Sequence, residues 1–281
     1  MPLHPAVAAK ELPPAPAPLA VPVIDAHTHL DACGADTPEQ VGAAMARAAA
    51  VGVTRVVTVG DDLTSSRWAA RATDWHADLY AAVGIHPTLA ATLDDGVRAE
   101  VAALAARERV VAVGETGLDF YWDSAPADVQ REAFAWHIAL AKDLGKPLMI
   151  HDRDAHQAIW DVLIGEGAPD TVVFHCFSGD EEFAQRCVDA GFVLSFAGPV
   201  SFTNAKPLAR AATVVPAGQL LVETDAPFLT PHPFRGKRNE PYVLPYTVRA
   251  LAQIRGERLD EFCETVRLAT ERVYAFAAKS A

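Results

Sequence analysis

From residue 21 onward, short runs of β-branched and other apolar residues alternate with amphipathic segments of about a dozen residues. Eight such pairs can be counted. Because the apolar runs lack a regular polar alternation, they predict parallel strands that are covered on both faces. We expect the strands at residues 21–27, 55–60, 79–85, 110–114, 147–150, 171–174, 192–196 and 220–223.

Two of the expected helices carry clear boundary signals. The tetrapeptide Thr-Pro-Glu-Gln at 37–40 supplies an N-cap, a proline at the first helical position and a glutamine three residues after the cap. That helix should end at Gly52. Residues 127–144 form the clearest amphipathic segment, and a glycine and a proline follow it closely. The last helix is expected at 259–277.

An α/β alternation permits an open doubly wound sheet, with an extra lobe, or a closed barrel. The count of eight strands favours a (β/α)8 TIM-type barrel, as does the absence of a Gly-rich dinucleotide turn after the first strand. Polar residues also stand at the carboxyl ends of nearly every strand, where barrel active sites lie. We expect residues 21–281 to form a single barrel domain.

Residues 1–20 contain six prolines and a single lysine. This composition predicts a disordered Pro/Ala-rich leader rather than a secretory signal or an anchor. No later run approaches the roughly 20 apolar residues of a membrane span. The four cysteines show no paired metal-ligand spacing and are expected to be reduced thiols. The chain is therefore expected to be soluble and cytoplasmic, with no obligate protein partner.

The charge balance limits the class of partner. With 24 basic and 36 acidic residues, the formal net charge is −12. Such a surface opposes the broad electrostatic binding of phosphates that a general nucleic-acid coat protein needs. A polyanionic substrate must instead be held locally, by metal ions and a few basic side chains.

Two histidines end the first predicted strand. His27 and His29 are separated by one residue, so the period of two in a strand directs both side chains to the same face. Solvated histidines form such pairs by chance, but this pair follows an apolar run that should be buried. We expect one divalent cation to bind both imidazoles.

Two acidic residues end other predicted strands. Glu115 follows a buried run, where an unpaired carboxylate is costly unless it is neutral or bound to a cation. Its two oxygens could bridge two metal ions, and the alternative is a salt bridge to Arg153. Asp225 follows the eighth strand, which neighbours the first strand in a closed barrel. Asp225 should therefore lie beside His27 and His29 as a ligand.

His151 and His175 occupy the first polar positions after the fifth and sixth strands. A single histidine at such a position is more often a hydrogen-bonded core residue than a ligand. Two of them on neighbouring strands that face Glu115 instead predict a second pair of metal ligands.

The remaining basic residues near strand ends are candidates for substrate binding. His86 could be a ligand, a proton donor or a phosphate contact, and we favour the substrate contact. Arg153 can offer its planar guanidinium to a phosphate. Arg235, Lys237 and Arg238 concentrate charge in a loop after the eighth strand, which we expect to contact a phosphate backbone from above the barrel mouth. A merely solvated charged face is the alternative for this loop.

These motifs resemble the TatD family of metal-dependent deoxyribonucleases, within the amidohydrolase-like superfamily. The resemblance rests on seven motifs in order, DAHTHL at 25–30, GIHP at 84–87, GETGLD at 114–119, HDR at 151–153, HCFSG at 175–179, ETDAP at 223–227 and RGKRNEP at 235–241. It covers residues 21–277, and the Pro-rich leader is the one departure from the family pattern.

The resemblance implies a TIM-type barrel with two metal ions, Mg²⁺ or Mn²⁺. His27, His29 and Asp225 would hold one ion and His151 and His175 the other, with Glu115 between them. Family members resemble nucleases, some of which act from the 3′ end of single-stranded DNA. The imidazole-rich ligand set itself suits Zn²⁺ or Mn²⁺ better than Mg²⁺.

We therefore expect hydrolysis of DNA phosphodiester bonds by a metal-activated water, with Asp225 as general base and Glu115 as the second catalytic residue. One alternative is a hydrolase of carbon esters or amides on the same centre. Another is a metal-binding protein without catalysis.

Overall fold

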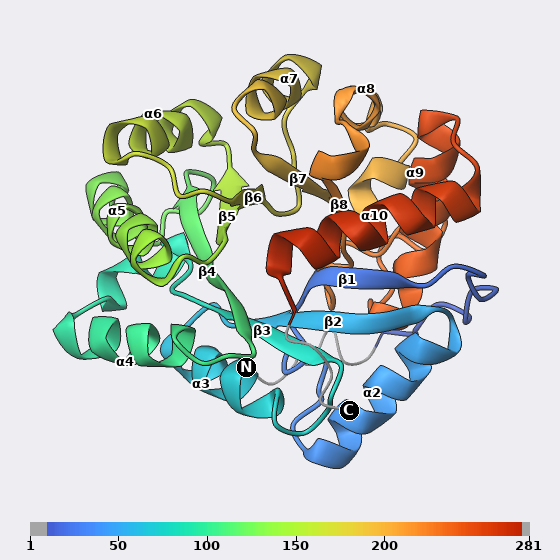
Figure 1. Ribbon diagram of the computed structural model, residues 1–281, viewed down its shortest axis with the longest axis horizontal. Coiled ribbons are helices and arrows are strands. Elements are labelled where there is room, and N and C mark those ends of the chain that lie inside the picture. Colours follow the sequence, from blue (N-terminus) through green and yellow to red (C-terminus); the bar gives the residue numbers. More distant parts are fainter. Residues whose placement is uncertain (1–9, 277–281) are drawn as a thin grey trace.

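The computed structural model describes residues 10–276. Within them, eight parallel strands lie side by side in chain order, from β1 to β8, inside a ring of helices (Figure 1). The strands are β1 (Val23–Thr28), β2 (Val53–Val59), β3 (Leu79–Val83), β4 (Val110–Asp119), β5 (Leu148–Arg153), β6 (Val172–Phe174), β7 (Val193–Phe196) and β8 (Leu220–Val222).

The last strand returns to the first. The residues that follow β8 bond to β1, because Asp225 N–H donates to His27 O at 3.0 Å and His29 N–H donates to Ala226 O at 2.7 Å. This closure confirms the TIM-type barrel and excludes the open sheet. It also brings the carboxyl ends of strands that are far apart in the chain to one end of the barrel.

Helices connect the strands and cover the outside of the barrel. They are α2 (Pro38–Ala50), α3 (Leu63–Ala72), α4 (Asp95–Ala105), α5 (Ala127–Leu144), α6 (His156–Glu166), α7 (Glu181–Asp189), α8 (Lys206–Val214), α9 (Leu244–Arg255) and α10 (Leu259–Tyr274), with 3₁₀ turns η1 (Pro87–Thr92), η2 (Gly198–Ser201), η3 (Ala217–Gln219) and η4 (Pro241–Val243). The predicted capping box of α2 is present, with Thr37 accepting from Gln40 N–H. None of the helices in residues 10–276 combines the length and hydropathy needed to span a bilayer.

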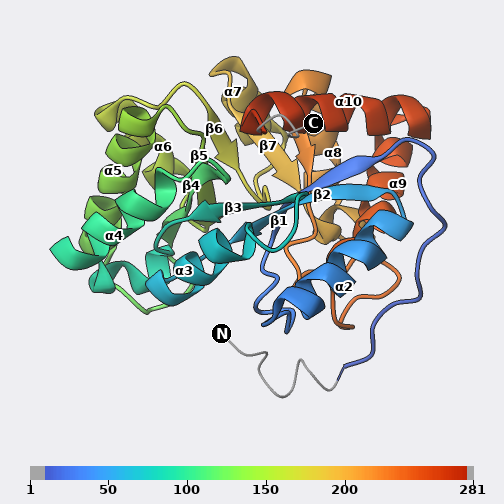
Figure 2. The same cartoon turned by 60° about the horizontal axis from the view of Figure 1, so that its bottom comes forward.

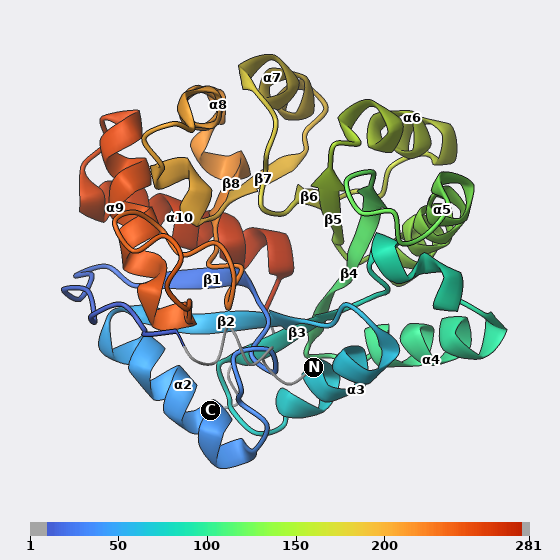
Figure 3. The same ribbon diagram turned by 180° about the vertical axis from the view of Figure 1, so that it is seen from behind.

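The hydrophobic core has an outer and an inner part. The outer part lies between the strands and the helices, and the inner part fills the barrel with side chains such as Val57, Ala112 and Val173. The end of α10 joins the inner part through Val273 and Tyr274. In Figure 1 this helix crosses in front of the strands, whereas in Figure 3 it lies behind them and the loops after the strands come forward. One end of the barrel is thus covered, and the end in Figure 3 carries the site.

The leader was predicted to be disordered, and for residues 10–20 this is wrong. Pro13, Pro16 and Leu19 are buried, every third residue, which matches the three residues per turn of a polyproline helix. Tyr242 donates its hydroxyl to Pro13 O at 2.6 Å and Arg249 donates to Ala17 O at 2.7 Å. The segment runs along the outer side of α9 (Figure 2). Residues 1–9 and 277–281 lie outside the described residues.

Two strands extend further than the sequence predicted. β4 reaches Asp119 rather than residue 114, and β5 reaches Arg153 rather than residue 150. The apolar pattern stops at the first polar residue, but the ladder continues because Gly117 pairs with His151. A Cβ on Gly117 would lie 2.1 Å from His151 O, so glycine permits this close approach.

Candidate metal centre

The first cluster of polar side chains joins β1 to the residue after β8. His27 Nε2 and His29 Nε2 lie 3.1 Å apart. Both nitrogens lie 3.6 Å from Asp225 Oδ1, and they lie 3.6 and 3.7 Å from Glu115 Oε2. We call this set the first subsite. All four side chains are buried.

The spacing in the first subsite fits a divalent cation. Ligands arranged tetrahedrally about 2.1 Å from a metal ion lie about 3.4 Å from one another. His27 Nε2 and His29 Nε2 lie at close to this distance from each other, from Asp225 Oδ1 and from Glu115 Oε2. Two imidazole nitrogens that face each other also need a proton or a cation between them, since two lone pairs repel.

The second cluster joins β4, β5 and β6. Glu115 Oε1 lies 2.8 Å from His151 Nδ1 and 2.8 Å from His175 Nε2. We call these three residues the second subsite. The two oxygens of Glu115 therefore face different pairs of histidines, which is the arrangement expected of a carboxylate that bridges two cations.

His151, His175 and His29 each make a further contact through the ring nitrogen that does not face a subsite. Asp119 Oδ2 lies 2.9 Å from His151 Nε2, and Glu223 Oε1 lies 3.3 Å from His175 Nδ1. His29 Nδ1 donates to Val59 O at 3.0 Å. Such contacts fix the tautomer and the orientation of a ligating imidazole.

Asp119 and Glu223 are site residues that sequence reasoning missed. The signal that could have found them is the period of two along a strand. Asp119 is four residues after Glu115, and Glu223 is two residues before Asp225. Glu223 is also fully buried and accepts hydrogen bonds from Cys176 N–H and the Ser195 hydroxyl.

The protonation of the first subsite is uneven in the absence of metal. Burial lowers the pKa of His27 well below its usual value, and the neighbouring His175 adds to the effect. Burial also acts on His29, but the carboxylates of Asp225 and Glu115 outweigh it and raise its pKa to about 9. In the absence of metal, His29 is therefore protonated near pH 7 and His27 is neutral, and a cation can replace the extra proton.

Glu115 remains ionised despite its burial. Burial raises the pKa of a carboxyl group, but the charges and hydrogen bonds of His175 and His151 outweigh this effect and bring the pKa of Glu115 well below its usual value. A permanently charged bridging carboxylate is ready to bind cations. The salt bridge to Arg153 that was the alternative for Glu115 is not formed among the described contacts.

His86 faces the second subsite without joining it. Its Nε2 lies 3.6 Å from Glu115 Oε1, and its Nδ1 accepts from Thr88 N–H at 3.2 Å. Burial lowers the pKa of His86 to about 4, although the Glu115 charge opposes this. His86 is thus neutral near pH 7, with its remaining proton on Nε2 and directed at the site.

A cavity of about 490 Å³ opens over both subsites. Its lining includes the two candidate substrate contacts His86 and Arg153. Cys176 also lines it, because the left-handed φ of 42° after β6 interrupts the strand alternation. Burial raises the pKa of the Cys176 thiol well above its usual value, which opposes a role as nucleophile.

The basic loop is not brought into this cavity. None of Arg235, Lys237 and Arg238 belongs to its lining. Arg235 lies over the Phe202 ring and Lys237 pairs with Glu11 at 3.2 Å. Arg238 donates to Cys33 O at 2.6 Å, so its guanidinium supports the loop itself. These side chains contact the leader and neighbouring groups instead of the cavity.

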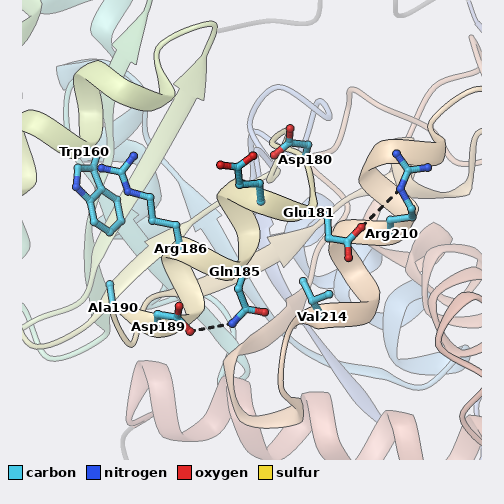
Figure 4. A pocket seen from close by; sticks show the side chains of 10 residues that line it. Trp160, Asp180, Glu181, Gln185, Arg186, Asp189, Ala190, Arg210 and Val214 are labelled. Carbon is cyan, nitrogen blue, oxygen red and sulfur yellow. Dashed lines mark hydrogen bonds and ion pairs between the residues drawn. The ribbon is translucent and has the colours of Figure 1, made fainter.

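A larger groove of about 910 Å³ lies elsewhere, on the outer helices α6, α7 and α8 (Figure 4). Arg186 extends over the Trp160 ring there, and Arg210 pairs with Glu181 at 3.7 Å. Its lining contains neither histidine nor cysteine. Volume alone would favour this groove, but the convergent donor atoms favour the barrel mouth.

Sequence comparisons with known proteins all give the same family. The profile of the family described as TatD related DNase matches residues 24–275. A Mycobacterium tuberculosis protein named uncharacterized metal-dependent hydrolase TatD is 57% identical over 90% of this chain and 97% of its own length. A 3′-5′ ssDNA/RNA exonuclease TatD of Cronobacter sakazakii is 38% identical over 76% of this chain and 83% of its own.

The fold comparison agrees. The crystal structure of YJJV, a TATD homolog from Escherichia coli, superposes with a TM-score of 0.84 at 27% identity. It covers 91% of this chain and 98% of that one.

Proposed function

The chain belongs to the TatD related DNase family, and we propose that it hydrolyses phosphodiester bonds of DNA with the help of two divalent cations. The proposed substrate is single-stranded DNA, and the proposed direction of cleavage is from the 3′ end. The name of the Cronobacter sakazakii relative supports both. The observation that carries the proposal is the placement of Glu115, with one oxygen toward each pair of histidines.

The residues present fit a pair of cations. His27, His29 and Asp225 would hold one and His151 and His175 the other, with Glu115 shared. Bound there, divalent cations lower the pKa of a water and neutralise charge on phosphate oxygens. The resemblance favours Mg²⁺ or Mn²⁺, whereas the four imidazoles favour Mn²⁺ or Zn²⁺ on affinity, so Mn²⁺ satisfies both arguments.

The protein's own groups divide the remaining tasks. Asp225 lines the cavity and accepts the proton of the attacking water as general base. His86 donates a hydrogen bond from its Nε2–H to a phosphate oxygen. Arg153 binds a neighbouring phosphate through its guanidinium. Arg235, Lys237 and Arg238 can contact only a strand that extends beyond the cavity.

A labelled-strand assay tests this function. Purified protein is incubated with single-stranded DNA labelled at the 5′ or the 3′ end, in Mg²⁺, Mn²⁺ or Zn²⁺, beside small carbon esters and amides. We expect metal-dependent loss of nucleotides from the 3′ end and no turnover of the small substrates. Turnover of an ester or amide alone would replace the proposal with the acyl-hydrolase alternative, and metal binding without any turnover would indicate a non-catalytic protein.

A further inference from the structure

Exposed aromatic side chains gather at the mouth of the metal cavity. Within residues 10–276, seven large hydrophobic side chains are exposed, and four of them are aromatic. All four belong to two segments, the one that follows β4 and the one that follows β8. We call this set the aromatic rim, and it consists of Phe120, Tyr121, Trp122 and Phe228.

Backbone N–H groups of the rim donate hydrogen bonds to two residues of the candidate metal centre, Asp119 and Asp225. Asp119 Oδ1 accepts from Tyr121 N–H at 3.0 Å and from Trp122 N–H at 2.9 Å, while its Oδ2 contacts His151. On the other side, Phe228 N–H donates to Asp225 O at 2.9 Å. The same residues therefore set the positions of the aromatic rings and of the candidate catalytic groups.

The rim is not part of the hydrophobic core. Trp122 is 59% exposed and Phe228 is 51% exposed, yet both line the cavity that holds the histidines. Exposed apolar surface that is gathered in one place indicates a binding site. β4 and β8 are four strands apart in the ring of eight, so the segments that carry Trp122 and Phe228 start from opposite sides of the barrel.

A cationic side chain accompanies the aromatic rings. The Arg153 guanidinium lies 4.5 Å from the centre of the Tyr121 ring and also lines the cavity. Aromatic faces for bases beside basic groups for phosphates are the combination by which proteins bind single-stranded nucleic acid without reading its sequence. In an acidic protein of net charge −12, this local combination can supply binding that the overall surface cannot.

Building on the proposed nuclease function, we propose that Trp122 and Phe228 stack against unpaired bases of the substrate strand and hold them on opposite sides of the metal centre. Paired bases in a duplex are already stacked on each other and present no free face. The aromatic rim therefore makes the site selective for single strands or frayed ends.

A binding experiment separates the bases from the backbone. Two fluorescein-labelled oligomers of equal length and phosphorothioate backbone are compared in Mn²⁺, one of thymidine and one abasic. We expect the wild-type protein to bind the thymidine oligomer roughly tenfold to a hundredfold more tightly. Trp122→Ala and Phe228→Ala should each remove much of this difference and leave binding of the abasic oligomer unchanged.

Two further variants complete the design. Trp122→Phe keeps a ring and should retain most of the preference. Ile164→Ala changes a side chain on α6 that is also 59% exposed, and it should bind both oligomers as the wild type does. Equal binding of the two oligomers by the wild type, or equal losses for both with Trp122→Ala, would overturn the proposal.

The outcome is independent of catalysis. Hydrolysis of ordinary single-stranded DNA is measured separately on the same variants. A preference for bases without hydrolysis would refute the nuclease function alone, whereas hydrolysis without a preference for bases would refute the stacking role alone.

Discussion

Glu223 holds the imidazole of His175 from behind, with its Oε1 lying 3.3 Å from His175 Nδ1. This contact leaves His175 Nε2 free to face Glu115. Glu223 itself is fully buried, and its second oxygen accepts from the Ser195 hydroxyl. A buried carboxylate with this set of partners orients a ligand rather than contacting solvent.

Replacing Glu223 by Gln should weaken metal binding. Loss of the negative charge makes His175 less basic and less firmly oriented, and removal of such a partner typically lowers affinity about 10- to 100-fold. Titration of the metal-free protein with Mn²⁺ by calorimetry measures the change. Glu261→Gln, on the exposed side of α10, is the matched control. Unchanged affinity for the weaker of two ions would contradict the role of Glu223.

The convergence of the candidate ligands could be predicted from the sequence, and the reason is topological. His151 and His175 are the first polar residues after their apolar runs, and His27 lies at the end of another such run. Strands that follow each other in the chain are neighbours in a barrel. No side-chain detail was needed to bring them together. Asp119 was not predicted as a site residue because the apolar pattern of β4 stops before it, although the strand continues.

Other features depend on contacts between distant parts of the chain. The leader is ordered by Tyr242 and Arg249, which lie more than 200 positions away. Lys237 likewise forms an ion pair with Glu11, which is distant in the chain. The composition of the leader indicates that it has no hydrophobic core of its own. The composition does not show that Tyr242 and Arg249 bind the leader to the barrel.

Replacing Glu115 by Ala should abolish metal-dependent hydrolysis while the barrel remains folded. The variant loses the carboxylate that reaches both pairs of histidines, so the number of bound Mn²⁺ ions should fall. Loss of the buried carboxylate should lower the Tm, but the barrel should still form, because its large hydrophobic core does not include this side chain. Activity assays, metal analysis and circular dichroism test this, and retained turnover would defeat the assignment.

Removal of metal should destabilise the protein. A ligand that binds only the folded state stabilises it by about 2.7 kcal/mol at a hundredfold excess over its Kd, which corresponds to a rise in Tm on the order of 5 °C for a chain of this size. Thermal unfolding with EDTA and with Mn²⁺ measures the difference. The Glu115→Ala variant should show a much smaller shift, and an equal shift would place the stabilising ions elsewhere.

Two of the arginines predicted to bind phosphate, Arg153 and Arg238, should behave differently. Arg153→Ala should raise KM for single-stranded DNA about tenfold with little change in Tm, since its side chain is exposed and lines the cavity. Arg238→Ala should lower Tm and leave KM nearly unchanged, because its guanidinium bonds to Cys33 O and Glu240. The reverse pattern would restore the basic loop as the phosphate site.

His137 should make the fold sensitive to acid. This buried side chain on α5 accepts from Ile85 N–H at 3.1 Å and donates to Ala133 O at 2.7 Å, which requires the neutral ring. Burial lowers the pKa of His137 to about 4, below the unfolded value of 6.5. The unfolded state therefore binds a proton that the folded state does not, and this group's contribution is complete above pH 6.5 and is lost as pH falls toward 4.

The expected loss from His137 is about 3 kcal/mol over this pH range. Urea unfolding in EDTA, from pH 8 to pH 4.5, measures the free energy of unfolding without bound metal. His137→Gln should be less stable than the wild type at pH 8, and the gap should narrow as the pH falls, because glutamine does not titrate. His232→Gln changes an exposed histidine and should keep the wild-type slope. Parallel curves for the wild type and His137→Gln would show that another group controls the acid sensitivity.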